Sequence, residues 1–169
     1  AQWIFGSDTK TEKVVIHLHG GGYVTSAIDA YQMMGISMAQ TLGRKVLLPE
    51  YRRAPEHPFP AALEDALTAY RWLLGQGIEA RNIIIAGESA GGGLALAALL
   101  AFKDTGLPLP AAGMVMSPMT DLTMSGESHR SLRTSPAAGG IAARSAHPQH
   151  PGGLRRGPGR ADPLLFRRP

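Results

Sequence analysis

Short apolar runs alternate with segments of helical periodicity between about residues 13 and 118. The runs end at glycine or proline, as buried strands commonly do, and the segments between them repeat apolar residues every three or four positions. We therefore expect strands over 14–19, 45–51, 82–87 and 111–118, and helices that begin near Asp29, after Pro60 and at 93. This alternation predicts an α/β fold with a mostly parallel sheet and helices on both faces.

The first two expected helices each have an apolar stripe that should face the sheet. Asp29 is the N-cap expected for the first helix, and Pro58 and Pro60 lead into the second. The stripes consist of Tyr31, Met34, Met38 and Leu42 in the first helix, and of Leu63, Leu67, Tyr70 and Leu74 in the second.

Residues 134–169 show neither the apolar runs of strands nor the three- to four-residue apolar repeat of helices. Of these 36 residues, 24 are Arg, Pro, Gly or Ala, whose codons can consist of G and C alone. We interpret the segment as the product of a shifted reading frame in a GC-rich gene, and a natural disordered tail is the alternative. The expected organisation is a partial α/β domain over 1–133 and a tail over 134–169.

Charge and composition exclude several classes of protein. The net charge of +4 comes from the tail, which has six arginines and one acid (Asp162), so residues 1–133 sum to −1. We therefore predict no nucleic-acid partner for the folded part. There is no cysteine, which excludes disulfides and thiolate sites, and we predict no metal.

The chain shows no sign of a membrane span or a leader. No apolar run is long enough to cross a bilayer. The chain begins at Ala1 without an apolar leader, so we expect a trimmed N-terminus, and the lack of cysteine suits a cytoplasmic protein. The oligomeric state is not indicated.

A G-x-S-x-G pattern around Ser89 follows the strand expected over 82–87 and precedes the third helix. Such a serine occupies a sharp strand-to-helix turn, where flanking glycines avoid collisions and the helix N-terminus favours a developing negative charge. The pattern indicates a nucleophile. A serine that only caps the helix is the alternative.

A second motif, His19-Gly20-Gly21-Gly22-Tyr23, closes the first expected strand. Glycines in the loop after that strand allow backbone N–H groups to approach a reacting carbonyl oxygen. The other interpretation is a phosphate-binding loop, but the sequence here contains neither the G-x-G-x-x-G pattern nor the Lys-Ser/Thr pair of such loops. Two motifs in the right order support each other.

Four segments together resemble the hormone-sensitive-lipase-like family of bacterial carboxylesterases, which has the α/β-hydrolase fold. They are HLHGGGY (17–23), YRRAPEHPFPAALEDA (51–66), GESAGGGLA (87–95) and SPMTDLTMSGES (117–128). The resemblance implies hydrolysis of carboxylic esters with short acyl chains, through an acyl-enzyme and without a cofactor. It also implies that the chain lacks the family's C-terminal strands and N-terminal cap.

The resemblance assigns roles to residues around Ser89, the matched nucleophile. Gly21, Gly22 and Ala90 match the backbone donors of the oxyanion hole. His19 matches the motif histidine, which shapes the glycine loop, and Gly20 and Glu88 support that loop. Departures from the family pattern are Glu88 for the more usual Asp, Arg53 for Leu and Met119 for Trp.

The remaining candidates have structural interpretations. We expect His17 to be a core residue with a satisfied hydrogen bond, and His57 to fix a loop with Glu56 rather than act as a base. Glu64 and Asp65 suit a helix start. Asp121 is expected to anchor the loop after the fourth strand.

A serine nucleophile needs a histidine base and an acid that orients it. The family places both after two further strands. Here Asp162 imitates the acid motif too early, and His129, His147 and His150 lack a strand-end context. The triad acid and histidine are therefore unknown and expected to be absent, which predicts an impaired esterase.

Two other hypotheses stay open. One is a non-catalytic module that binds a small ligand on the same scaffold. The other is an arginine-rich tail that binds nucleic acid.

Overall fold

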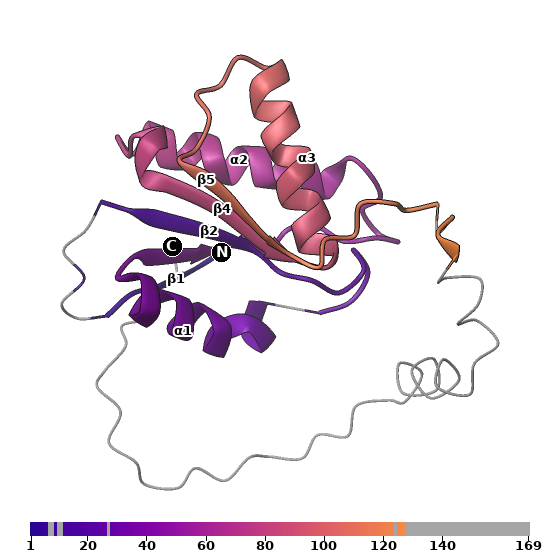
Figure 1. The fold of residues 1–169 in the computed structure, drawn as a ribbon, viewed down its shortest axis with the longest axis horizontal. Coiled ribbons are helices and arrows are strands. Elements are labelled where there is room, and N and C mark those ends of the chain that lie inside the picture. Colours follow the sequence, from indigo (N-terminus) through magenta and orange to yellow (C-terminus); the bar gives the residue numbers. More distant parts are fainter. Residues whose placement is uncertain (7–8, 10–11, 27, 124, 128–169) are drawn as a thin grey trace, which may run out of the picture. The chain divides into compact units, whose positions relative to one another are not determined.

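Five strands form one sheet in the computed structural model of the chain, in the order β1-β3-β2-β4-β5 (Figure 1). The structure describes residues 1–6, 9, 12–26, 28–123 and 125–127. All the elements belong to one unit containing Ala1–Thr120, and Asp121 begins a second unit. The strands are β1 (Gln2–Ile4), β2 (Val14–Leu18), β3 (Lys45–Leu48), β4 (Ile83–Glu88) and β5 (Ala112–Met116). The helices are α1 (Gln32–Leu42), α2 (Ala61–Gly75) and α3 (Ala90–Asp104), with short 3-10 helices η1 (Ile28–Tyr31) and η2 (Ala80–Asn82).

The direction of the chain across the sheet decides which face each helix covers. Strands β3, β2, β4 and β5 are parallel, and only β1 runs antiparallel, beside β3. The connection through α1 runs from β2 to β3, whereas those through α2 and α3 run the opposite way. Because such crossovers are right-handed, α1 covers one face of the sheet and α2 and α3 the other (Figure 1).

Strands β2 and β4 are neighbours whose following helices leave in opposite directions. In an open parallel sheet, ligands bind in the crevice beyond the carboxyl ends of such a pair. The register places Leu18 opposite Gly87, so the two strands end side by side. The His19–Tyr23 loop and the Ser89 turn therefore emerge together at this point.

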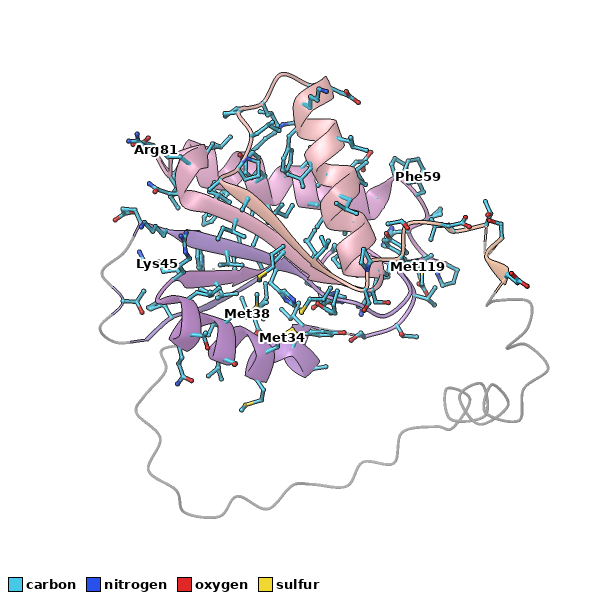
Figure 2. The ribbon with its side chains drawn as sticks, viewed as in Figure 1. Met34, Met38, Lys45, Phe59, Arg81 and Met119 are labelled. Carbon is cyan, nitrogen blue, oxygen red and sulfur yellow. The ribbon has the colours of Figure 1, made fainter. Side chains whose placement is uncertain are left out.

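The core has two layers, one on each face of the sheet. Every residue of β2 is buried, with alternate side chains entering the two layers. On the α2/α3 side Tyr70 stacks on Phe102, with ring centroids 4.0 Å apart. On the α1 side, Met34 and Met38 point from the helix toward the sheet (Figure 2). Burial on both faces explains why the central strands read as continuous apolar runs.

The predicted fold class and the order of strands and helices are confirmed. The sequence reasoning missed β1, a strand of three residues on the sheet edge. It also placed the start of α3 too late, because the helix begins at Ala90 directly after the motif serine. The division at residue 133 stays a prediction, since 134–169 lie outside the described residues.

The first helix differs from its prediction in two respects. Asp29 lies in η1 and accepts hydrogen bonds from the side chains of Gln2 and Gln32 at 2.8 Å, and the N-cap position is Tyr31 without a side-chain cap. The buried residues of α1 are Gly35 and Ala39, not the predicted large side chains. A Cβ at Gly35 would lie 2.5 Å from the Ile4 side chain, so small residues let the helix approach the sheet.

Candidate functional site

Ser89 occupies a strained turn between β4 and α3. Its φ is 52° and its ψ is −121°, a conformation that L-residues rarely adopt. It holds the N-cap position of α3, yet its side chain makes no capping hydrogen bond. The hydroxyl is thus not used by the helix, which argues against the interpretation of Ser89 as a simple cap.

The flanking glycines are required by close backbone contacts. A Cβ at Gly87 would collide with the backbone of Gly91, and a Cβ at Gly91 would collide with the carbonyl oxygen of Leu18. Both glycines are buried. The turn can therefore bring the start of α3 against the end of β2 only with glycine at these two positions.

The backbone of Ser89 is also held from the side of β5. Its N–H donates to the carbonyl oxygen of Met116 at 3.0 Å, and its carbonyl oxygen accepts from the N–H of Met119 at 2.8 Å and of Gly93 at 3.0 Å. Figure 2 shows Met119 beside the N-terminal end of α3. These bonds fix the turn, because both of the serine's backbone polar groups have partners outside β4.

The glycine loop after β2 is a tight turn with three consecutive positive φ angles. They are 115° at Gly21, 64° at Gly22 and 62° at Tyr23. The carbonyl oxygen of Gly21 accepts from the N–H groups of Val24 and Thr25 and from the Thr25 hydroxyl. Within the described residues, the N–H groups of Gly21 and Gly22 donate to no protein acceptor. Both are therefore available to a ligand oxygen.

Two anchors hold this loop to the segment after β3. The Tyr51 hydroxyl donates to the carbonyl oxygen of His19 at 2.6 Å, and the two rings stack with centroids 4.2 Å apart. The N–H of Ala54 donates to the carbonyl oxygen of Tyr23 at 2.9 Å. The YRRAPE segment that follows β3 thus supports both ends of the glycine loop.

His19 is a structural residue of the loop. It is 1% exposed, and its Nδ1 lies 2.8 Å from the carbonyl oxygen of Gly20, which can only accept, so Nδ1 carries the proton. Burial lowers the pKa of His19, and the Gly20 carbonyl and the Glu50 carboxylate only partly offset this effect. The ring is therefore neutral and already bonded, consistent with the predicted role in shaping the loop.

Glu88 connects the Ser89 turn between β4 and α3, called the elbow below, to the glycine loop. Its Oε1 accepts a 2.5 Å hydrogen bond from the N–H of Gly20, and its Oε2 lies 2.8 Å from Nε2 of His17. Burial raises the pKa of Glu88, but contacts with His17, the Gly20 amide and the Tyr31 hydroxyl outweigh it, so the pKa lies below its ordinary value. Glu88 is therefore a carboxylate at neutral pH.

The N-terminus of α3 adds to the positive field at this point. The N–H of Ala90 lies in the first turn, where helical amides have no intrahelical acceptor. The helix dipole carries partial positive charge at the same end. The loop that carries Gly21 and Gly22 emerges at the same edge of the sheet as this helix end and the half-buried Ser89. Backbone N–H groups at such an edge can stabilise an oxyanion.

The other sequence candidates among the described residues make contacts that do not include the Ser89 side chain. His57 is exposed, and its N–H donates to the carbonyl oxygen of Arg53. Glu64 and Asp65 pair with Arg52 at 3.0 and 2.9 Å. Asp121 accepts from Thr123 and Ser125 and so orders its own loop, as predicted.

The described part of the chain contains no base in contact with Ser89. Its histidines are His17, His19 and His57, and none of them bonds to the serine hydroxyl. The candidates His129, His147, His150 and Asp162 lie outside the described residues. Among the described residues, no group of three His, Asp or Glu side chains is placed to hold a metal ion.

The sequence reasoning found the two motifs but not the contacts that join them. His17 is buried as expected; its Nε2 lies 2.8 Å from Oε2 of Glu88, and its Nδ1 has no partner among the described residues. The available signal was a histidine within a buried apolar strand together with an acid at the end of the strand that carries the serine motif. Tyr51 was likewise noted only as part of the YRRAPEHPFPAALEDA segment, and its contact with His19 was not predicted.

Comparison with known proteins agrees with this fold. A family model described as the alpha/beta hydrolase fold matches residues 15–147. The chain therefore belongs to the alpha/beta hydrolase fold family. An acetyl-hydrolase from Streptomyces hygroscopicus is 43% identical over 129 residues, which make up 76% of this chain and 43% of that protein.

Solved structures point to the same group of esterases. An esterase/lipase from an uncultured bacterium has a TM-score of 0.75 and 42% identity, over 85% of this chain and 49% of that one. An esterase from the bacterial hormone-sensitive lipase family has a TM-score of 0.73 and 46% identity, over 75% of this chain and 42% of that one. The chain thus spans less than half the length of these relatives. None of its described helices is long and apolar enough to cross a membrane.

Proposed function

We propose that the site acts on carboxylic esters through Ser89. The observation that carries this proposal is the strained Ser89 turn, whose hydroxyl does not cap α3, at the sheet edge from which the loop with the unbonded N–H groups of Gly21 and Gly22 also emerges. Enzymes of this chemistry place a nucleophile beside donors that are aimed at the developing negative charge. The acetyl-hydrolase and esterase names of the relatives are consistent with it.

In the proposed reaction the Ser89 oxygen attacks the ester carbonyl carbon. The carbonyl oxygen becomes an oxyanion and accepts from the N–H groups of Gly21, Gly22 and Ala90. Collapse of this intermediate breaks the bond to the alcohol and leaves an acyl group on Ser89, which water then removes. A small-molecule ester with a short acyl chain is the proposed substrate.

The Ser89 hydroxyl must lose its proton in the acylation step, and the attacking water must lose one in the second step, so each step needs a proton acceptor. Because no described histidine contacts Ser89, we propose that turnover by this chain is impaired, whereas reaction with an activated reagent persists. An oxyanion hole without its base retains part of the catalysis in serine hydrolases. The acylation step is therefore the one to measure.

The test is covalent labelling by diethyl p-nitrophenyl phosphate, followed by the mass of the intact protein and by peptide mapping. We expect one adduct on Ser89 of the folded chain, and none in Ser89→Ala. Ser37→Ala is the matched control, because Ser37 is an exposed serine of α1 and its loss should leave labelling unchanged. Labelling that persists in Ser89→Ala, or that is missing from the folded wild type, would overturn the proposal.

A non-catalytic module that binds small esters or acids is the second candidate. It is supported by the lack of a base in contact with Ser89 among the described residues. It predicts that p-nitrophenyl butyrate binds the folded chain while the phosphate reagent forms no adduct. Adduct formation at Ser89 decides between the two.

A further inference from the structure

His17 and Glu88 contact each other between β2 and β4, close in sequence to the two motifs. His17 is fully buried in the middle of β2, and the Glu88 side chain is 17% exposed at the end of β4. The atoms that approach are Nε2 of His17 and Oε2 of Glu88, at 2.8 Å. Neither residue contacts the Ser89 hydroxyl, so the pair is not needed to explain the proposed attack itself.

Burying a polar ring in the central strand of a sheet carries a cost. His17 lies on the same side of β2 as Val15, in a layer whose buried side chains are aliphatic and where the Tyr31 ring is its aromatic neighbour, with centroids 6.0 Å apart. A buried imidazole or carboxylate without a partner loses hydration that apolar neighbours cannot replace. A valine or isoleucine would fill the position without this loss. The histidine is therefore better explained by what it does to Glu88 than by packing.

Each carboxylate oxygen of Glu88 has its own partner, and the Tyr31 hydroxyl is a further contact of this side chain. Oε1 holds the N–H of Gly20, the first glycine of the loop, and Oε2 faces His17. A carboxylate held at only one oxygen can rotate about its last side-chain bond. With His17 at Oε2, rotation would cost the second contact, so Oε1 stays directed at Gly20.

The Gly20 contact then determines where the loop begins. A Cβ at Gly20 would lie 3.2 Å from the Glu88 carbonyl oxygen and from the Tyr31 hydroxyl, so the loop starts in close contact with the elbow. Gly21 and Gly22 follow directly. A shift of Gly20 would move both of their N–H groups relative to Ser89.

We propose that His17 is a positioning residue for the oxyanion loop, acting through Glu88 and the N–H of Gly20. The inference rests on the proposed function, since positioning matters to catalysis only if Gly21 and Gly22 bind an oxyanion. Its structural part, that His17 sets the Gly20 contact, is independent of any reaction. The two parts are therefore tested separately.

The structural part is tested by the amide proton resonance of Gly20 in the full chain. The variants are His17→Phe, which keeps a ring but removes the N–H, and His17→Gln, which keeps an N–H donor. Because a short bond to a carboxylate moves an amide proton downfield, we expect an upfield shift and about tenfold faster hydrogen exchange in His17→Phe. His17→Gln should stay near the wild type.

The catalytic part is tested by the kinetics of Ser89 phosphorylation by diethyl p-nitrophenyl phosphate. A mispositioned loop should lower the maximal rate of inactivation about tenfold or more, with the inhibition constant KI unchanged. Tyr70→Phe is the matched control, because it also removes one buried hydrogen bond, to the Pro108 carbonyl oxygen in the other core layer. It should change neither the Gly20 signal nor the rate.

The outcomes separate this proposal from the proposed function. If Ser89 of the wild type is never labelled, the esterase proposal fails, and the Gly20 resonance alone decides what His17 does. If Gly20 is unchanged in His17→Phe, the positioning role is overturned whatever the labelling. Equal losses in His17→Phe and His17→Gln, or the same loss in Tyr70→Phe, would also overturn it, because ring volume or general stability would then be the cause.

Discussion

The hydroxyl of Tyr51 donates to the carbonyl oxygen of His19 at 2.6 Å, while its ring stacks on the His19 imidazole. Burial raises the pKa of Tyr51, so the hydroxyl remains a donor throughout the accessible pH range. This single side chain holds the residue from which the glycine loop departs. It therefore links the segment after β3 to the candidate oxyanion hole.

Replacing Tyr51 by Phe should destabilise the chain and slow the reaction of Ser89. The ring stack is kept, but the buried carbonyl of His19 loses its donor, at a cost of about 1 to 2 kcal/mol in the free energy of unfolding. Urea unfolding and phosphate labelling measure the two effects. Tyr70→Phe should cost a similar stability without slowing labelling. Unchanged labelling of Tyr51→Phe would show that the loop does not depend on this bond.

Gly91→Ala should be among the most harmful substitutions in the motif. The added Cβ would meet the carbonyl oxygens of Leu18 and His19, which are backbone atoms and cannot rotate away. We expect a loss of about 2 to 3 kcal/mol in the free energy of unfolding. Gly75→Ala is the control: nothing lies within 4 Å of its Cβ, and it should be neutral or stabilise by up to about 1 kcal/mol. Equal effects would contradict the close packing of elbow and β2.

His19 should remain neutral to a lower pH than a free histidine. Burial holds its folded pKa below 6.5, so as the pH falls through 6.5 the unfolded chain takes up the proton first. The stability due to neutral His19 is thus present above pH 6.5 and is lost as the pH falls toward the folded pKa. The ring resonances of His19 in an NMR titration report this. A midpoint at or above 6.5 would be inconsistent with the buried ring.

Glu88→Gln should cost stability in a way that depends on pH. The folded pKa of Glu88 lies below 4.5, so its charged form stabilises the fold above about that pH, and the effect is lost as the pH falls through the folded pKa. The difference in unfolding free energy between wild type and Glu88→Gln should therefore shrink below pH 4.5. Urea titrations from neutral pH downward measure it. A constant difference would mean that the carboxylate charge contributes nothing.

Periodicity and glycine spacing were enough to predict the sheet, its helices and the place of Ser89. They succeeded because β2 and β4 are buried on both faces and leave a continuous apolar signal. The edge strand β1 left none, since three residues paired on one side need no such pattern. The stripe of α1 was only partly predicted: Tyr31 and Met38 pack against the core, but the fully buried residues are Gly35 and Ala39, which a search for large apolar residues overlooks.

The chemistry of the site was only partly visible in the sequence. The roles assigned to Ser89, Gly21 and Gly22 follow from local motifs and stay predictions until labelling is measured. The contacts of Glu88 with Gly20 and His17 join residues far apart in the chain, so no local pattern encodes them. They depend on the register of β2 with β4, which only the folded sheet fixes.

The turn at Ser89 is completed by residues that come after it in the chain. The N–H of Ser89 donates to the carbonyl oxygen of Met116 in β5, and its carbonyl oxygen accepts from the N–H of Met119, which follows that strand. The conformation of this serine is therefore held in part by a strand and a segment that the G-x-S-x-G motif does not include.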